Sequence, residues 1–468
     1  MSPAAPFVVR ADRVLTGVGG EVITDGAVLI ADGRVRAIGR RRDLPTGLPS
    51  ADAGLLLMPG LIDAHTHLRG TPLSAQDIPT RPLESWLCSL TTATDLDPAD
   101  DALVAAAHAL ESGITAVQAV VHGFDEAAGV VRRMRATAGA VTSAGLRALL
   151  ILGFTDRAEL TPDPAGGPWR DVPAVRHGVT ATGFGDVARE VLGGDDDPDR
   201  LLRYGLGPVG PQWVGDVGLE VIAAAGRGHR RHTHLHESRS QRGWVAGEPS
   251  PLSRLARAGI IGADLSAAHG VDLHDAEIAR LAAAGVGLVH CPRSNDDLAV
   301  GTARVAEWLR RGVRVGLGTD SARERPDIFD DMRDAIVAAE RIGDPVSPEA
   351  VIAMATTGGA DALGANGLGR IRVGGPADMI GLDVEVRGAG DAREAAGVIV
   401  ERAARGHVSR VWVAGRQVVD AGVAMADTRA ARERLAVTIR ADETARAGRQ
   451  RRLAPVLEAV DREIASVT

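Results

Sequence analysis

An alternation of apolar strand-like runs and helix-like segments occupies the middle of the chain, from about residue 55 to 365. In one intervening segment, residues 275–284, Ile278 and Leu281 share a helical face and Gly285 follows as a natural stop. Repeated βα units build parallel sheets, and eight of them can close into a barrel. The apolar runs are residues 55–63, 115–122, 146–155, 202–209, 231–236, 264–269, 286–291 and 313–319.

Both ends of the chain have a different sequence pattern, which favours β-strands. Short apolar runs separated by Gly-rich or Asp-Gly breaks indicate hairpins near the N-terminus, and similar runs return after residue 376. The 468 residues also exceed the roughly 250–300 that one core usually holds. We therefore predict an α/β fold: a distorted (β/α)8 barrel of the TIM type with a small antiparallel β-sandwich domain formed by both chain ends. The predicted parts are residues 1–57 (sandwich, first part), 58–368 (barrel), 369–426 (sandwich, second part) and 427–468 (helical tail).

Residues 161–200 are rich in Pro, Gly and Asp and far exceed the usual length of a strand–helix connection. Such a segment is either an active-site cover or a surface elaboration. The sequence leaves both open.

The chain contains no lysine, because all 53 of its basic Lys and Arg residues are arginine. This excludes Schiff-base chemistry through lysine, a P-loop, and a carboxylated lysine bridging two metals. Only two cysteines occur, Cys88 and Cys291, so neither a disulfide framework nor a cysteine-rich zinc site is available. We interpret both as buried small residues and not as nucleophiles.

The charge distribution argues against two classes of partner. The net charge is −8, and arginines are interleaved with acids, so neither nucleic acid nor an anionic membrane is an expected partner. The first residues lack the pattern of a signal peptide, and no apolar stretch reaches the 18 or so residues of a membrane helix. We expect a cytoplasmic protein.

Histidines or carboxylates end five of the eight apolar runs, on the side where barrels of this type carry their working residues. His65 and His67 share one face of their strand, and two imidazoles so placed suit a borderline divalent metal such as zinc. The sequence therefore predicts a metal centre at these strand ends. The terminal residues concerned are His65 and His67; His232, His234, His236 and Glu237; His269; His290, Ser294 and Asn295; and Asp320.

The residues by themselves leave several roles open. His232, His234 and His236 share strand parity, so parity does not select among them. Asp63 equally suits a structural hydrogen-bond acceptor. His122, which ends the second run, is a candidate for the pocket wall or for the core.

The chain resembles the amidohydrolase superfamily, in the branch of single-metal deaminases and chlorohydrolases. That branch includes methylthioadenosine/S-adenosylhomocysteine, guanine and cytosine deaminases and triazine hydrolases. The resemblance spans residues 55–385 and the flanking β-domain. Its motifs are Pro-Gly-Leu-Ile-Asp-Ala-His-Thr-His at 59–67, His-x-x-Glu at 234–237, His-Cys-Pro-x-Ser-Asn at 290–295 and Gly-Thr-Asp at 318–320.

The resemblance implies one divalent metal ion, with zinc expected and iron or manganese as alternatives. Such an ion can lower the pKa of a bound water from about 15.7 towards roughly 7. Glu237 matches the proton-transferring acid of the family, and His269 the histidine that contacts the attacking water or the substrate. Asp320 would accept the proton of that water. The implied metal ligands are His65, His67, His234 and Asp320.

The substrate pocket differs from that of the family's nucleoside deaminases. Those enzymes carry a histidine in Gly-Pro-His after the fourth strand, where this chain has Val209. Valine cannot donate a hydrogen bond, so an adenosine-type substrate is disfavoured. Residues assigned to substrate binding are Arg69, His122, His236, His290, Ser294 and Asn295.

The residues bear on three possible functions. We expect hydrolytic deamination of an amino-substituted nitrogen heterocycle: a purine, pyrimidine, pterin or triazine. The alternative keeps the same centre but displaces chloride or opens a cyclic amide. A barrel without catalysis, serving as a binding protein, predicts missing ligands, and none is missing. The expected partners are a small heterocyclic substrate and, from the resemblance, further copies of the chain in a homodimer or larger homo-oligomer.

Overall fold

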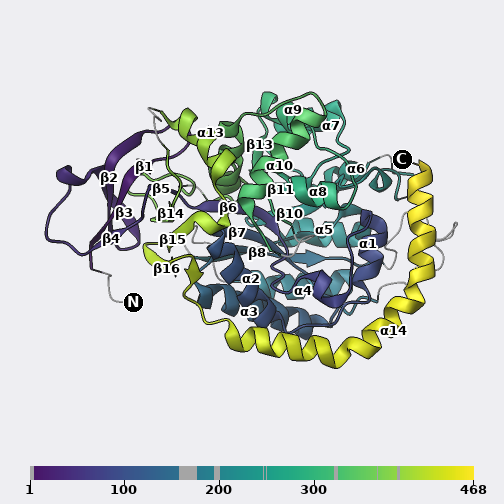
Figure 1. Cartoon of the computed structure of the whole chain (residues 1–468). Coiled ribbons are helices and arrows are strands. Elements are labelled where there is room, and N and C mark those ends of the chain that lie inside the picture. Colours follow the sequence, from purple (N-terminus) through teal and green to yellow (C-terminus); the bar gives the residue numbers. More distant parts are fainter. Residues whose placement is uncertain are drawn as a thin grey trace.

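A barrel of eight parallel strands and a separate nine-stranded mixed sheet make up the protein (Figure 1). In Figure 1 the mixed sheet lies to the left of the barrel, and the C-terminal helix runs along the lower and right-hand edge. The computed structural model describes residues 5–157, 176–193, 201–245, 247–248, 250–320, 325–365, 367–386 and 391–467.

The barrel strands follow one another in chain order, and every neighbouring pair is parallel, as predicted. A parallel bridge between Thr66 and Asp320 joins the first strand to the last at their C-terminal ends. The barrel is therefore nearly closed, and its seam lies at the predicted site. The strands are β6 (Leu61–Thr66), β7 (Ile114–Val121), β8 (Arg147–Phe154), β9 (Leu202–Pro208), β10 (Arg230–Leu235), β11 (Leu265–His269), β12 (Gly287–His290) and β13 (Arg314–Leu317).

The first predicted run, residues 55–63, is in fact divided between the two sheets. β5 (Leu56–Pro59) pairs with strands of the mixed sheet, and β6 begins only after Gly60. A side chain at Gly60 would collide with Thr115, so the chain can pass from one sheet to the other here only without a Cβ. Both strands are apolar and fully buried, which is why the sequence pattern merged them.

The mixed sheet combines strands from both chain ends, as predicted, in the order β17-β16-β15-β14-β5-β1-β2-β3 with β4 beside β1. All its pairs are antiparallel except β1 with β4 and β1 with β5. The remaining strands are β1 (Phe7–Leu15), β2 (Val22–Ala31), β3 (Arg34–Arg40), β4 (Ser50–Asp52), β14 (Met379–Leu382), β15 (Val408–Val413), β16 (Arg416–Asp420) and β17 (Val423–Ala424).

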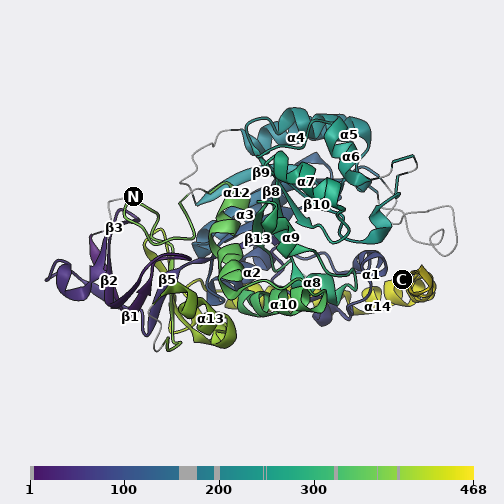
Figure 2. The ribbon, with the colours of Figure 1, turned by 90° about the horizontal axis from the view of Figure 1, so that it is seen from above.

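Helices cover the outside of the barrel (Figure 2), and the large apolar core lies between them and the strands. A smaller cluster fills the barrel interior and includes Ile62, Ala116 and Cys291, against which the helix Gly359–Leu363 packs. The helices are α1 (Leu83–Leu90), α2 (Pro98–Glu111), α3 (Ala127–Ala144), α4 (Ala181–Leu192), α5 (Asp216–Ala225), α6 (Pro251–Arg257), α7 (Asp275–Ala283), α8 (Pro292–Asp297), α9 (Val305–Arg310), α10 (Ile328–Arg341), α11 (Pro348–Ala353), α12 (Gly359–Leu363), α13 (Ala392–Arg402) and α14 (Arg429–Val467).

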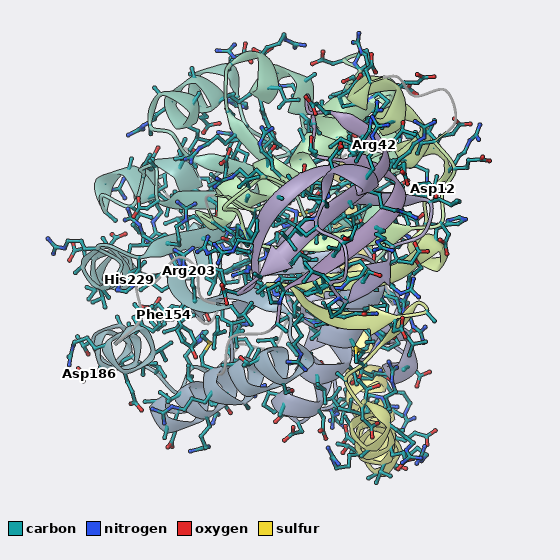
Figure 3. The ribbon with its side chains drawn as sticks, turned by 90° about the vertical axis from the view of Figure 1, so that its left-hand side faces the viewer. Asp12, Arg42, Phe154, Asp186, Arg203 and His229 are labelled. Atoms are coloured by element: carbon teal, nitrogen blue, oxygen red, sulfur yellow. The ribbon has the colours of Figure 1, made fainter. Side chains whose placement is uncertain are left out.

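The long connection predicted at residues 161–200 contains a helix, α4. The side-chain hydroxyl of Thr180 caps its N-terminus by accepting the backbone N–H of Gly183. Phe184 of α4 stacks on Phe154 at the end of β8, with ring centroids 4.3 Å apart. Figure 3 shows Phe154 beside the helix that carries Asp186. Residues 161–175 and 194–200 lie outside the described residues, so their suggested role as a cover stays a prediction, as do the domain boundaries.

The C-terminal tail is helical, as expected from its charge pattern. α14 follows the outside of α2 and α1, where Leu453 and Leu457 bury Cys88. Within the described part of the chain, no helix is long and apolar enough to cross a membrane.

Candidate metal and catalytic centre

The seam of the barrel brings the predicted ligands of the first and last strands together. The backbone N–H of Asp320 donates to the carbonyl of His65 at 2.8 Å, and the Thr66 hydroxyl donates to the carbonyl of Asp320 at 3.0 Å. Asp63 reinforces the seam, because its carboxylate accepts hydrogen bonds from both the backbone and the hydroxyl of Thr319. Asp63 therefore acts as a structural acceptor, one of the two roles that the sequence left open.

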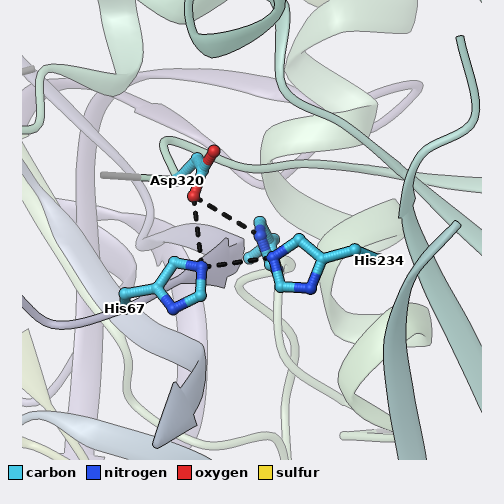
Figure 4. Close-up of side chains that lie close together, drawn as sticks. His67, His234 and Asp320 are labelled. Carbon is cyan, nitrogen blue, oxygen red and sulfur yellow. Dashed lines mark hydrogen bonds and ion pairs between the residues drawn. The ribbon is translucent and has the colours of Figure 1, made fainter. Parts of the chain in front are cut away.

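Four donor atoms converge at this seam (Figure 4). Nε2 of His67 lies 3.2 Å from Nε2 of His234 and 3.4 Å from Oδ1 of Asp320. Nε2 of His65 lies 3.5 Å from the same oxygen and is buried without a hydrogen-bond partner in the described structure. Four donors at zinc's usual bond length of about 2.0–2.1 Å would stand about 3.3–3.5 Å apart in a tetrahedron. The spacing and the N3O donor set thus fit one divalent ion.

The protonation states also suit a cation. Burial is the largest influence on all three ligand histidines: it lowers the pKa of His65 to about 4 and lowers the pKa values of His67 and His234. The imidazoles are therefore neutral near pH 7, with a lone pair available. Burial would raise the pKa of Asp320, but the adjacent imidazole of His65, together with those of His67 and His269, holds that pKa well below its usual range. An ionised carboxylate joins three neutral nitrogens, the state in which these groups bind metals.

His232 supports the ligand His65 from behind. Nδ1 of His65 lies 2.8 Å from Nε2 of His232, whose Nδ1 lies 2.8 Å from the hydroxyl of Ser266 and from the amide of Gln118. A hydrogen bond at the far nitrogen of a ligating imidazole fixes its ring orientation and tautomer. The carbonyl of Val209 does the same for His234, accepting from Nδ1 at 2.6 Å.

Ser294 and Asn295, in α8, bind residues of the centre: Ser294 contacts Asp320, and Asn295 contacts His269. The hydroxyl of Ser294 donates to Oδ2 of Asp320 at 2.5 Å, leaving Oδ1 towards the histidines. Nδ1 of His269 lies 2.9 Å from Oδ1 of Asn295, so the Nδ1 proton is held there. Nε2 of His269 is buried without a partner among the described residues and lies 3.7 Å from the Glu237 carboxylate. This nitrogen is free to accept a hydrogen bond from a water molecule or from substrate.

Glu237 lies beside the donors, immediately after β10. Burial is the main cause that raises its pKa, to about 8, and the charges of Asp320 and Glu84 act in the same direction. Gln241 accepts the backbone N–H of Glu237 at 3.0 Å and thereby holds the turn. A carboxyl group that is protonated near neutral pH can give its proton to a substrate nitrogen.

The backbone turns sharply at several of these strand ends. Leu68, His236, His269 and Asp320 all have positive φ, between 48° and 74°. L-residues rarely adopt this conformation, and it persists where the surrounding structure imposes it, often at functional sites. The turn at Leu68 follows directly on the ligand His67.

Two residues assigned to substrate binding lie apart from the donors. Nε2 of His236 lies 2.9 Å from the Ser250 hydroxyl and 3.3 Å from the Glu277 carboxylate, because the positive φ of His236 turns its side chain towards α7. His290 is buried with its ring edge-on to Trp308, and burial lowers its pKa to about 3. The structure therefore brings neither His236 nor His290 into the donor cluster.

Arg69 and His122 line a cavity of about 470 Å³ next to the centre. Its apolar walls include Phe124 and Trp213, and Val209 contributes to the same surface. A smaller cavity of about 240 Å³ reaches from Arg69 and His122 to the ligand His67. The two cavities share Arg69 and His122, and the smaller one connects these residues with the donor His67.

The sequence did not single out Gln118 and Ser266. Both are buried polar residues in otherwise apolar strands, β7 and β11, and both face the barrel interior beside His232. A polar residue at an interior strand position is the signal that could have indicated them. Glu84 of α1, which accepts the Ser238 hydroxyl at 2.6 Å, adds a further carboxylate near Glu237.

Both the sequence and the fold are similar to those of known enzymes. Among curated relatives, the 5-methylthioadenosine/S-adenosylhomocysteine deaminase of Moorella thermoacetica is 32% identical over 390 residues, covering 80% of this chain and 85% of the relative. The enzyme of the same name from Haloarcula marismortui is 33% identical over 341 residues, covering 70% and 73%.

Solved structures of related enzymes are similar to this chain over nearly its whole length. A zinc-bound adenosine deaminase from Xanthomonas campestris has a TM-score of 0.77 at 26% identity, covering 94% of this chain and 98% of the other. A zinc complex of atrazine chlorohydrolase from Arthrobacter aurescens TC1 has a TM-score of 0.77 at 25% identity, covering 92% and 100%. The model of the amidohydrolase family matches residues 56–418. This chain belongs to the amidohydrolase family.

Proposed function

We propose that this protein is a metal-dependent deaminase that releases ammonia from an amino-substituted nitrogen heterocycle. The observation that carries the proposal is the pairing of the N3O donor cluster with Glu237, a buried acid whose pKa is raised to about 8. Deamination requires an activated water and a group that moves a proton to the ring and the leaving amine. The similarity to deaminases of 32–33% identity supports the same assignment.

His65, His67, His234 and Asp320 would hold the ion, with zinc first among the alternatives because zinc-bound relatives share the fold. A bound divalent ion lowers the pKa of a water molecule and polarises it. The proposal assigns the remaining proton transfers to side chains of the chain itself.

Glu237 would start in the protonated state and donate to a ring nitrogen of the substrate. The neighbouring carbon then becomes more electrophilic. Once water has added there, the Glu237 carboxylate can take up the proton of the new hydroxyl group as the C=O bond forms, and can pass that proton to the departing amine as the C–N bond breaks. His269 would accept a hydrogen bond from the attacking water at Nε2, because Asn295 holds the proton on Nδ1. Asp320 would take the first proton from that water through Oδ1, while Ser294 engages Oδ2.

Within this class we propose a substrate other than adenosine-type nucleosides. Val209 lines the cavity and offers only its carbonyl, which is already bonded to His234. Chloride displacement by the same residues is the second candidate, supported by the 25% identity to an atrazine chlorohydrolase over nearly the whole chain.

The test is a screen of the zinc-loaded protein against purines, pyrimidines, pterins, triazines and their chlorinated counterparts. Ammonia release that Glu237→Gln abolishes would support deamination. Chloride release without ammonia would replace it with the second candidate. No reaction with any amino or chloro heterocycle, from protein that contains stoichiometric zinc, would contradict both.

A further inference from the structure

Arg69 carries an unpaired charge beside the metal centre. In the part of the chain that the structure describes, its guanidinium has no hydrogen-bond or ion-pair partner; only the ring of Trp86 lies against it, 5.8 Å from Cζ. Burial lowers the pKa of Arg69, opposed by the charges of Asp320 and Asp101, and a guanidinium nevertheless stays protonated at any working pH. Holding an unpaired charge at a partly buried position is costly unless a partner arrives.

Arg133, which lines the same cavity, already has ion-pair partners. Its Nη2 atom lies 3.1 Å from the Asp125 carboxylate and 3.5 Å from that of Asp95. Arg69 therefore differs from it in having its donors available. The cavity can therefore supply carboxylate partners to an arginine, as it does to Arg133, but it supplies none to Arg69 among the described residues.

The backbone that carries Arg69 is fixed. The Asp101 carboxylate of α2 accepts the N–H groups of Gly70 and Thr71 at 3.2 and 2.8 Å, so its oxygen is used on the main chain. A Cβ at Gly70 would collide with the backbone of Asp101 and with Val104, which shows how closely this turn is packed. The guanidinium is thus presented from a rigid turn two residues after the ligand His67, as a preorganised recognition group would be.

A second polar group points to a ligand in the same place. His122, at the end of β7, lines both cavities next to Arg69, and its Nε2 is buried without a partner among the described residues. Burial lowers the pKa of His122 to about 4, so the ring is neutral and can donate one hydrogen bond. Phe124 lies edge-on to this ring at 4.7 Å and forms an apolar wall.

We propose that Arg69 binds a carboxylate of the substrate, so that the amino heterocycle turned over at the metal centre is an acid. A guanidinium forms two parallel hydrogen bonds with a planar carboxylate. The charges of Asp320 and Asp101 already act on Arg69, so a monoanion balances the site better than a phosphate would. His122 supplies a further hydrogen bond, and the ring packs between Phe124 and Trp213. This inference rests on the proposed deaminase function and narrows its substrate class.

The test compares matched substrates that differ by one carboxylate: pterin with pterin-6-carboxylate, and cytosine with 5-carboxycytosine. We expect kcat/KM for ammonia release to favour at least one acid by roughly 10- to 100-fold over its neutral partner, the effect of a charged hydrogen-bond pair. Arg69→Met should remove that preference through KM, and Arg69→Lys should restore part of it. Arg132→Met, an exposed arginine on α3, is the control for loss of one charge and should leave the preference intact.

Folding is checked separately. Because Arg69 is unpaired, Arg69→Met should melt no lower than the wild type, and Arg69→Lys provides a second variant with the charge kept. Equal kcat/KM for acids and neutral partners in the wild type would overturn the inference, as would a preference that survives Arg69→Met. A larger gain for cytidine 5′-monophosphate over cytidine, lost in Arg69→Met, would replace the carboxylate with a phosphate.

Binding separates this inference from the function on which it rests. Isothermal titration of zinc-loaded Glu237→Gln with each pair measures the preference without turnover. If no probe releases ammonia but Arg69→Met in that background still abolishes tighter binding of an acid, the deaminase function fails and acid recognition stands. If ammonia is released while titration shows equal binding of acid and neutral probes, acid recognition fails alone.

Discussion

Oδ1 of Asp320 lies 3.4 Å from Nε2 of His67, across the seam between the last and the first strand of the barrel. The two residues are far apart in sequence, and the parallel bridge between Thr66 and Asp320 brings them together. Closure of the barrel and assembly of the metal centre are thus one structural event.

Asp320→Asn should weaken metal binding. The amide keeps the shape of the side chain but removes the only ligand charge, since the three histidines are neutral. We expect zinc content after dialysis to fall well below one equivalent, measured by atomic emission. Asp331→Asn is the matched control: burial raises the pKa of Asp331 well above its ordinary value, so an amide resembles its neutral state. Full zinc retention by Asp320→Asn would contradict the ligand assignment.

The rate of ammonia release should fall at alkaline pH because Glu237 must be protonated to act. With a pKa of about 8, the acid form dominates below that value and decreases tenfold for each pH unit above it. Glu237→Gln cannot donate a proton, and its kcat should be about 10²- to 10⁴-fold lower. The measurement is kcat from pH 6 to 10, with zinc content verified at each pH. A Gln variant within threefold of the wild type would rule out this role.

His232→Gln should weaken zinc binding indirectly, because it removes the hydrogen bond to Nδ1 of the ligand His65. Loss of such a supporting bond typically costs about 10- to 100-fold in metal affinity. Competition with a fluorescent chelator measures the change in Kd. His236→Gln is the control from the same strand end, since His236 contacts Ser250 and Glu277 instead. Equal affinities in both variants would show that the His65–His232 contact has no effect on the metal.

Glu277→Gln should reduce stability at neutral pH but not in acid. Burial raises the pKa of Glu277, but hydrogen bonds from His236, Arg242 and Ser250 outweigh it and bring the pKa far below its ordinary value. A depressed folded-state pKa adds stability above the unfolded value of about 4.5, and this stability is lost as the pH falls below it. We expect the variant to lose about 2–3 kcal/mol at pH 7 and progressively less below pH 4.5.

Urea unfolding of metal-free protein from pH 3 to 7.5 provides the measurement, with the exposed Glu340→Gln as control. A constant difference between wild type and Glu277→Gln over that range would contradict the assignment.

Much of the fold could be predicted because the barrel strands are apolar runs with polar ends, a local and periodic signal. The split at Gly60 could not, since β5 and β6 are equally apolar and only their pairing partners differ. Among the strand-end histidines, parity alone did not select His234, and family resemblance was needed. The backbone conformation of His236 is what turns that residue towards Glu277.

The sequence by itself determined which chemical groups this protein brings to its strand ends: paired imidazoles, two carboxyl groups and no lysine. The pairing of the imidazoles follows from residue type and a two-residue repeat, and the proton-transferring role of Glu237 from the family resemblance. Only the tertiary structure decided which groups meet. The bonds of Ser294 to Asp320 and of Asn295 to His269, and the free guanidinium of Arg69, depend on strand stagger, on turns with positive φ and on contacts between distant segments. No local pattern encodes those distances, because they are set when the barrel closes.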